Sequence, residues 1–239
     1  MLRPIVKFDY FGLPIYLIMA LTGFLFALVS LSNKQECLNY APDIKKRVRW
    51  SFIIGILAAL FCANIANWFL FPKILQYSFA QKISTGGFSF YYGMFGFFGV
   101  SSLLLWVQRL DFKFWINRIV PSVLIFHAFG RIGCSLSGCC YGIKMRFFGV
   151  YFDFPAREIE ALALFILYFV FEKKIKERRF CLYLLCYSVI RFLLEFGRAD
   201  ERGRLFVTWI SPAQVTSVMI WFVLGIYLFI IKSINFKKK

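Results

Sequence analysis

The sequence predicts an all-α integral membrane protein with about seven transmembrane helices. First, 60% of the 239 residues are hydrophobic and the mean hydropathy is +0.69, whereas soluble domains are only about 45–50% apolar. Second, the apolar residues form blocks near the roughly 20 residues that a helix needs to cross a bilayer. Third, the polar connections are all short. We therefore expect one polytopic membrane domain over residues 1–239.

Seven apolar blocks are the predicted helices, and they run over residues 11–31, 51–72, 87–107, 119–140, 156–171, 180–197 and 209–231. The fifth and sixth blocks are short, so they either tilt less or extend into their polar flanks. The first block is long for the apolar part of a signal peptide, and no small-residue cleavage site follows it, so we expect a retained span. Gly93, Gly96 and Gly99 are spaced for close helix approach.

The net charge of +17 is interpreted as membrane topology. In a soluble protein it would favour nucleic acid, but here the basic residues cluster between apolar blocks, so we expect no nucleic-acid partner. Seventeen of the 29 Lys and Arg residues lie in alternate connections, over 32–50, 108–118, 172–179 and the C-terminal tail. This excess predicts a cytoplasmic C-terminus and an N-terminus outside.

Two arginines, Arg131 and Arg191, lie inside apolar blocks. A charged side chain near the bilayer centre costs at least about 2.5–3.5 kcal/mol, so such residues usually face a polar cavity, a substrate or a counter-ion. The guanidinium group offers a planar fork of donors that suits phosphate or carboxylate. We expect both arginines to lie near the outer ends of their helices and to hold an anion.

Arg131 belongs to a glycine-rich stretch from His127 to Gly142. Each glycine weakens a helix by about 1 kcal/mol relative to alanine. The glycines at 130, 133, 138 and 142 therefore predict either backbone that approaches a bound group at an unwound helix end, or a tight helix-packing seam.

The same stretch contains the only histidine and three cysteines. His127 lies four residues before Arg131 and can share its helix face, either as a catalytic residue or as a hydrogen-bonded one. A zinc site of His127, Cys134, Cys139 and Cys140 is disfavoured, because adjacent cysteines point in different helical directions and no CxxC pair exists. The seven cysteines show no disulfide framework.

Carboxylates accompany the second arginine and open the fifth block. On a helix, Arg191, Glu195 and Arg198 would share one face. An Arg191–Glu195 ion pair makes burial tolerable, whether as a structural salt bridge or as a way to aim the arginine at a phosphate. The helix dipole favours Glu158, whereas Glu160 lies deeper and is the better partner for a buried arginine.

Two tyrosines, Tyr91 and Tyr92, follow a glycine pair at residues 86–87. They belong to an aromatic belt at the membrane surface, or one of them exchanges a proton with a substrate.

These motifs together resemble those of the bacterial prolipoprotein diacylglyceryl transferase family. The resemblance is carried by five ordered stretches, at 86–96, 127–142, 155–160, 191–198 and 211–214. The sequence departs from the family pattern at Cys134, where the best-known members have asparagine, and at Cys139, where they have glutamate. Tyr91 stands where many members have histidine.

The resemblance implies a multi-pass enzyme of the bacterial plasma membrane. Its reaction moves a diacylglyceryl group from phosphatidylglycerol to the lipobox cysteine thiol of a prolipoprotein, forming a thioether and releasing glycerol phosphate. The expected catalytic residues are Arg131, Arg191, Tyr91 and Glu195. The expected substrate-binding residues are Arg198, Glu160, Cys134, Gly133, Ser137, Gly138 and His127. We expect no metal or organic cofactor, and a monomer.

Two other function classes stay open. The departures from the family pattern allow a paralogous membrane enzyme that acts on anionic phospholipid with a different acceptor. A lipid-binding protein or transporter would use the same arginines without chemistry. The sequence shows no paired interrupted spans in two matching halves, which are the usual sign of a transporter.

Overall fold

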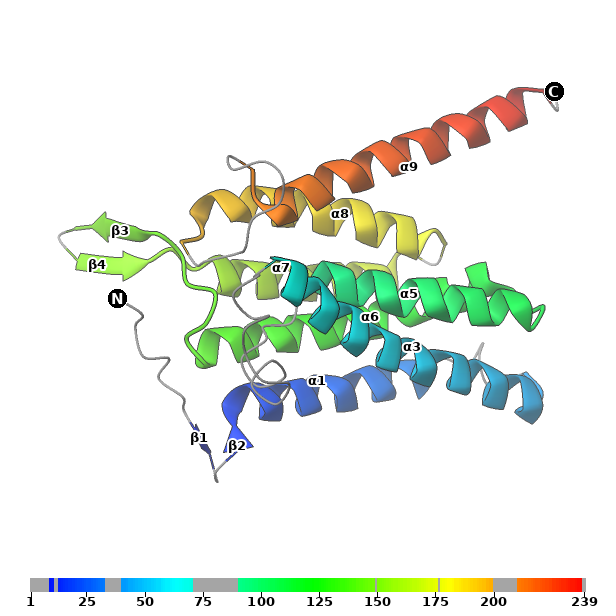
Figure 1. The fold of residues 1–239 in the computed structure, drawn as a ribbon, viewed down its shortest axis with the longest axis horizontal. Coiled ribbons are helices and arrows are strands. Elements are labelled where there is room, and N and C mark those ends of the chain that lie inside the picture. Colours follow the sequence, from blue (N-terminus) through cyan, green and yellow to red (C-terminus); the bar gives the residue numbers. More distant parts are fainter. Residues whose placement is uncertain are drawn as a thin grey trace. The chain divides into compact units, whose positions relative to one another are not determined.

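The computed structural model describes residues 9–10, 13–32, 40–70, 90–148, 150–175, 177–199 and 210–237. Over these ranges the chain is mainly helical (Figure 1). The helices are α1 (Ile15–Ser32), α3 (Pro42–Leu70), α5 (Phe90–Val107), α6 (Phe112–Leu136), α7 (Ala156–Lys173), α8 (Arg179–Leu194), the short 3₁₀ helix η2 (Glu195–Gly197) and α9 (Pro212–Lys237). Two antiparallel hairpins, β1 (Asp9–Tyr10) with β2 (Leu13–Pro14) and β3 (Lys144–Phe147) with β4 (Val150–Asp153), were not expected from the sequence.

Each predicted apolar block contains one long helix, so the prediction of a mainly helical membrane protein is confirmed. Among the described residues, five segments are long and apolar enough to cross a membrane, over 42–66, 90–107, 112–136, 179–197 and 212–230. α1 is apolar over the shorter range 15–31. α7 is less apolar because charged side chains occupy both of its ends, including Glu158, Glu160 and Lys173.

Two helices begin well before the apolar blocks that predicted them. α3 begins at Pro42 and α6 at Phe112, so part of the basic charge assigned to the 32–50 and 108–118 connections lies on helices. Proline suits the first position of a helix. The carboxylate of Asp111 caps α6 by accepting a hydrogen bond from the backbone N–H of Phe114 at 3.1 Å. Hydropathy does not reveal such a polar first turn.

The chain divides into two compact units. The first contains residues 1–31, 119–201 and 213–239, and the second contains residues 32–118 and 202–212. In the second unit, α3 packs against α5 through small residues. A Cβ atom on Gly96 would lie 2.8 Å from the carbonyl oxygen of Ala58 and 2.9 Å from Sγ of Cys62. The expected close approach is therefore present at Gly96, whereas Gly99 has open space beside it.

The core of the first unit is formed by α6, α7 and α8. Leu124, Leu164 and Tyr183, one from each helix, are fully buried. α1 packs on α6, where the rings of Phe26 and Phe129 stack with their centroids 5.1 Å apart. α9 packs on α8, where the indole N–H of Trp221 donates to Oγ of Ser188 at 2.8 Å.

A buried arginine closes the connection between α7 and α8. Arg179 is 2% exposed, and its Nη2 donates to the carbonyl oxygen of Phe171 at 2.7 Å. A cation at the C-terminal end of a helix satisfies the last carbonyls and opposes the helix dipole. The sequence placed Arg179 among the topology-determining loop cations, but here it caps α7. The antiparallel return of α8 brings its last turns beside Glu160, near the start of α7.

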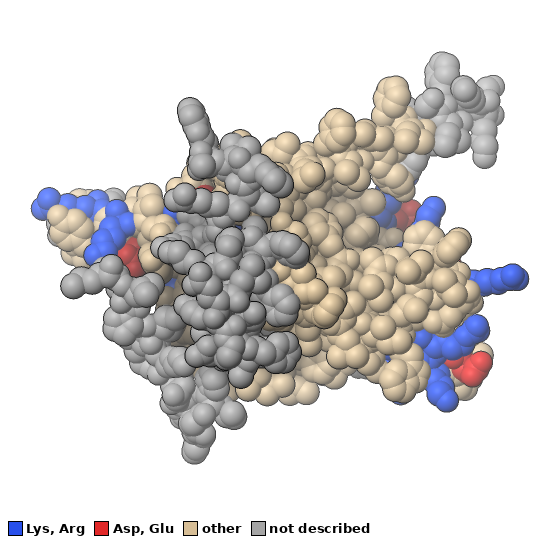
Figure 2. All heavy atoms as spheres, viewed as in Figure 1, with Lys and Arg blue, Asp and Glu red and all other residues tan. Residues whose placement is uncertain are grey.

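The connection between α6 and α7 carries the exposed β3–β4 hairpin. Lys144 pairs with Asp153 across the strands, and the guanidinium carbon of Arg146 lies 5.5 Å from the ring centroid of Tyr151. Phe148 at the tip is 91% exposed. Basic side chains gather over this hairpin (Figure 2). Exposed aromatic and basic residues together are typical of a membrane–water interface.

Candidate active site

One buried carboxylate gathers the charged side chains of the first unit. Glu160 of α7 is 1% exposed. Nε of Arg131, from α6, lies 3.0 Å from its Oε1, and Nη1 of Arg191, from α8, lies 3.9 Å from its Oε2. The two guanidinium groups therefore converge on a single side chain. The pairing of Glu160 with a buried arginine, expected from its depth in the helix, is present.

Arg191 contacts a second buried carboxylate. Its Nη2 lies 2.9 Å from Oε2 of Glu195, which is the expected pair four residues apart. Arg198 does not continue this helix face, so that expectation was wrong. α8 ends at Leu194, η2 follows, and Arg198 has extended backbone (φ −98°, ψ 146°) that forms an isolated bridge with Gly142. The buried Arg198 is thus held by the turn after α6 instead of by the helix.

A tyrosine that the sequence did not single out links Arg131 to Glu160. The hydroxyl of Tyr187 donates to Oε1 of Glu160 at 3.0 Å and accepts from Nη2 of Arg131 at 3.3 Å. Tyr187 is 1% exposed. It lies four residues before Arg191 on α8, so helical spacing alone would have placed it on the arginine's face.

His127 shares the face of Arg131, as its spacing predicts. Its Nε2 lies 4.0 Å from Oε1 of Glu160, and its Nδ1 lies 3.4 Å from the hydroxyl of Tyr183. The His127 ring also meets the Tyr187 ring edge-to-face, with the centroids 4.7 Å apart. Both ring nitrogens thus lie near residues of α7 and α8, which indicates a hydrogen-bonding role within the cluster.

The charges of this cluster balance, and some of its arginine nitrogens have no hydrogen-bond partner in the part of the chain that the structure describes. Two guanidinium groups stand against two carboxylates, and this pairing makes their burial tolerable. Among the described residues, the buried Nε of Arg131 and Nη1 of Arg191 have no hydrogen-bond partner, although both lie within 4.0 Å of Glu160. Such N–H groups on rigidly held guanidinium planes can bind the oxygens of a phosphate.

The glycines near Arg131 serve different purposes, and the predicted packing seam is present. A Cβ atom on Gly133 would lie 3.1 Å from the ring of Tyr16 on α1, so this position is a packing seam. Gly142 lies against the carbonyl oxygen of Phe154, where a side chain has no room. Gly130 has open space beside it.

The end of α6 is shaped by Ser137 and Gly138. Oγ of Ser137 donates to the carbonyl oxygen of Gly133 at 2.7 Å. Gly138 has a φ of 69°, the left-handed backbone that commonly ends a helix. These contacts give Ser137 and Gly138 a structural task, and their contact with a substrate stays a prediction.

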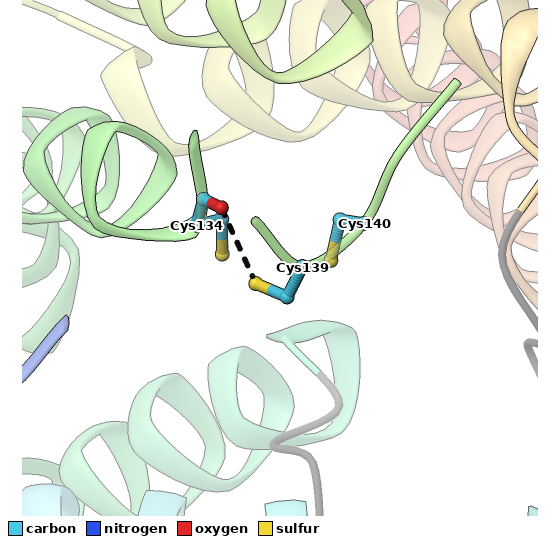
Figure 3. Close-up of side chains that lie close together, drawn as sticks. All are labelled: Cys134, Cys139 and Cys140. Atoms are coloured by element: carbon cyan, nitrogen blue, oxygen red, sulfur yellow. Dashed lines mark hydrogen bonds between the residues drawn. The ribbon is translucent and has the colours of Figure 1, made fainter. Parts of the chain in front are cut away.

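Three cysteine sulfurs lie together at this helix end. The Sγ atoms of Cys134, Cys139 and Cys140 are all within 4.8 Å of one another (Figure 3). Hydrogen bonds from the thiols of Cys134 and Cys139 hold the pKa of the Cys140 thiol well below its ordinary value, and the charges of Arg198 and Arg131 act in the same direction.

Tyr91 lies on α5 in the second unit. It is 5% exposed, and its ring stacks on that of Phe95 with the centroids 6.3 Å apart. This burial does not match an aromatic-belt residue that faces the membrane surface, and its role as a base stays a prediction. The glycine pair at 86–87 lies outside the described residues.

The fold and the site together define a polytopic helical membrane protein with a cluster of paired arginines and carboxylates buried among α6, α7 and α8. Comparison with known proteins gives the family. The family model for prolipoprotein diacylglyceryl transferase matches residues 4–231, so the chain belongs to that family, and it is an enzyme of the transferase class.

Individual relatives match between 52% and 98% of the chain. The phosphatidylglycerol–prolipoprotein diacylglyceryl transferase of Clostridium tetani is 30% identical over 252 residues, which cover 94% of this chain and 96% of the relative. Phosphatidylglycerol–prolipoprotein diacylglyceryl transferase 2 of Clostridium perfringens is 32% identical over 146 residues, which cover 52% of this chain and 54% of the relative. The phosphatidylglycerol–prolipoprotein diacylglyceryl transferase of Campylobacter jejuni subsp. doylei is 25% identical over an alignment of 261 residues, which covers 98% of this chain and 94% of the relative. The resemblance noted in the sequence is confirmed.

Proposed function

We propose that the protein transfers a diacylglyceryl group from phosphatidylglycerol to the lipobox cysteine thiol of a prolipoprotein. The donor and the acceptor class come from the names of the relatives. One observation in this chain supports the chemistry. Arg131 and Arg191 converge on Glu160, while each has a buried nitrogen without a hydrogen-bond partner among the described residues.

The reaction breaks a C–O bond of the glycerol phosphate ester. The thiolate sulfur attacks the glycerol carbon, a thioether forms, and the bonding electron pair leaves with the phosphate oxygen as glycerol phosphate. Negative charge grows on the phosphate in the transition state, where oriented guanidinium donors stabilise it. Glu160, Glu195 and Tyr187 act as positioning residues, because they hold the arginine planes in place.

The substrate thiol must lose its proton before it attacks. We assign this step to Tyr91, which stands at the family's histidine position. A phenol has an ordinary pKa near 10, so Tyr91 serves as a base only if a positive charge lies close to it in the complex with substrate.

In the membrane, the proposed enzyme has seven spans, its N-terminus outside and its C-terminus in the cytoplasm. Seven long helices occur among the described residues, and the distribution of Lys and Arg supports the orientation. We place the protein in the bacterial plasma membrane as a monomer, with its arginines near the outer surface and the phosphate of the lipid within reach.

The test is a transfer assay with purified protein, phosphatidylglycerol and a lipobox peptide. We expect the peptide to gain the mass of a diacylglyceryl group and glycerol phosphate to appear in equal amount. A peptide with serine in place of its cysteine should stay unchanged. Arg131→Ala should abolish the transfer, whereas Arg146→Ala, on the exposed hairpin, should not. No mass gain under conditions where the Clostridium tetani relative is active would overturn the proposal.

A second candidate is a paralogous enzyme that uses the same lipid with another acceptor. It is favoured by Cys134 and Cys139, which stand where the best-known family members have asparagine and glutamate. This candidate predicts that glycerol phosphate is released while the lipobox peptide stays unmodified, so the same assay separates the two.

A further inference from the structure

The three sulfurs at the end of α6 have the spacing of a metal site. The Sγ atoms of Cys134, Cys139 and Cys140 all lie within 4.8 Å of one another. Zinc–sulfur bonds of about 2.3 Å in tetrahedral geometry place the sulfurs roughly 3.8 Å apart. Small rotations of the cysteine side chains therefore suffice to close all three sulfurs around one ion.

The backbone explains how adjacent cysteines reach the same point. Cys140 has a φ of 58°, a left-handed conformation that residues with a Cβ rarely adopt. Together with the left-handed Gly138, it folds the chain back over the helix end. Figure 3 shows Cys139 and Cys140 on this returning segment, with the Cys139 sulfur turned toward Cys134. The sequence argued against a metal site because adjacent cysteines on a helix point in different directions. Cys139 and Cys140 lie on a turn instead of a helix, so that argument does not apply to them.

The surroundings suit an anionic metal–thiolate group. Three thiolates with a divalent ion carry one net negative charge. Nη1 of Arg157 donates to the carbonyl oxygen of Cys139 at 2.8 Å, and the buried Arg198 forms a backbone bridge with Gly142, two residues after Cys140. Outer contacts of this kind orient the ligands of metal sites.

We propose that Cys134, Cys139 and Cys140 form a three-thiolate site for a thiophilic metal ion, with Zn²⁺ as the expected occupant. Soft sulfur ligands select this class of ion. Three protein ligands leave a fourth position for water or another small ligand. His127 does not fill this position, because its ring nitrogens lie by Glu160 and Tyr183.

The bound ion ties the end of α6 to the segment that holds Arg198. Directly after the cysteines, the backbone N–H of Ile143 donates to the carbonyl oxygen of Gly197 at 2.9 Å, and that of Ala199 donates to the carbonyl oxygen of Tyr141 at 3.1 Å. The site therefore stabilises the turn on which the position of Arg198 depends. It is independent of the proposed reaction, because no substrate is needed for the ion to bind.

The test measures metal binding by the full-length protein, purified in detergent under reducing conditions and stripped with a chelator. After loading with Zn²⁺ and removal of excess metal, we expect one zinc per protein by elemental analysis. Loading with Co²⁺ should give a sulfur-to-metal charge-transfer band. Cys139→Ser and Cys140→Ser, on the turn, should each lose the band and the stoichiometric zinc. The matched control, Cys181→Ser with Cys186→Ser, changes two cysteines of α8 and should keep both.

Circular dichroism shows whether the turn variants keep their helices. The proposal is wrong if the folded parent protein retains less than one equivalent of zinc. So does equal retention by folded Cys139→Ser or Cys140→Ser, or a loss of zinc in the α8 control as large as in those variants.

Discussion

Replacement of Glu160 by glutamine tests whether one carboxylate holds both arginines. The substitution keeps the shape of the side chain and an oxygen that can accept from Tyr187, but it removes the negative charge. Arg191 keeps Glu195 at 2.9 Å. Arg131 loses the one carboxylate that contacts it among the described residues. We therefore expect the damage to fall mainly on Arg131.

The size of the effect follows from burial. The side chain of Glu160 is 2% exposed and that of Arg131 is 10% exposed, so water screens the pair little. Removal of one partner from a buried ion pair costs about 3–5 kcal/mol, because the other charge stays uncompensated. The hydrogen bond from Arg131 to Tyr187 remains, which favours the lower end, about 3 kcal/mol. Misplacement of a catalytic group by about 1 Å costs roughly 10²-fold in rate, which is a loss of similar size.

The assay compares Glu160→Gln with Glu158→Gln in the same detergent. Glu158 lies on the same helix, but its side chain is 43% exposed and pairs with Arg157 at 3.5 Å, a kind of pair worth about 0–1 kcal/mol. Thermal unfolding should show a much larger loss for Glu160→Gln. Single-turnover transfer to the lipobox peptide should slow by about 10²-fold. If the two variants unfold at the same temperature and turn over at the same rate, Glu160 does not hold the arginines.

Two further substitutions have matched controls. Tyr187→Phe removes the hydroxyl between Arg131 and Glu160, and loss of a hydrogen bond to charged groups costs about 1.5–3 kcal/mol. The transfer rate should fall, and it should fall less for Tyr183→Phe, since Tyr183 contacts His127 instead; an equal fall would contradict this role. Gly142→Ala places a Cβ against the carbonyl oxygen of Phe154 and should lower the unfolding temperature. Gly130→Ala, on α6 with open space beside it, should raise stability by up to about 1 kcal/mol, and a loss as large as that of Gly142→Ala would refute the steric argument.

The sequence predicted those parts of the site that depend on regular helices. Apolar blocks located the helices, and the spacing of four residues placed Glu195 beside Arg191 and His127 beside Arg131. Glu160 followed from the need of a buried guanidinium for a counter-charge. Tyr187 was missed because a tyrosine in an apolar helix looks the same whether it faces lipid or a buried arginine. Its position four residues before Arg191 was the available signal.

The remaining parts depend on irregular backbone. The helical face predicted for Arg198 was wrong because α8 ends at Leu194, and nothing in hydropathy marks that end. The meeting of Cys139 and Cys140 with Cys134 requires left-handed backbone at Cys140, a conformation that residue type does not predict for cysteine. The β3–β4 hairpin has strands of four residues, which are too short to stand out from a polar connection.

The full pairing of the two arginines has a consequence for catalysis. A lipid phosphodiester carries one negative charge, and the leaving glycerol phosphate approaches two as the C–O bond breaks. Carboxylates that already neutralise Arg131 and Arg191 reduce the attraction for the lipid in its ground state. The N–H groups left over act most strongly when the second charge develops, which is the condition for raising the rate instead of only tightening binding.

Arg131→Lys separates these two roles. Lysine retains a positive charge for Glu160, so the unfolding temperature should stay close to that of the parent protein. Its ammonium group lacks the several rigidly directed nitrogens of a guanidinium plane, so the rate of transfer should fall by about 10²-fold, the size of loss seen when one oriented donor to a developing oxyanion is removed. The lipid concentration that gives half-maximal rate should change little. A lysine variant that transfers at the parent rate would show that charge alone suffices and that the guanidinium geometry is not what the site uses.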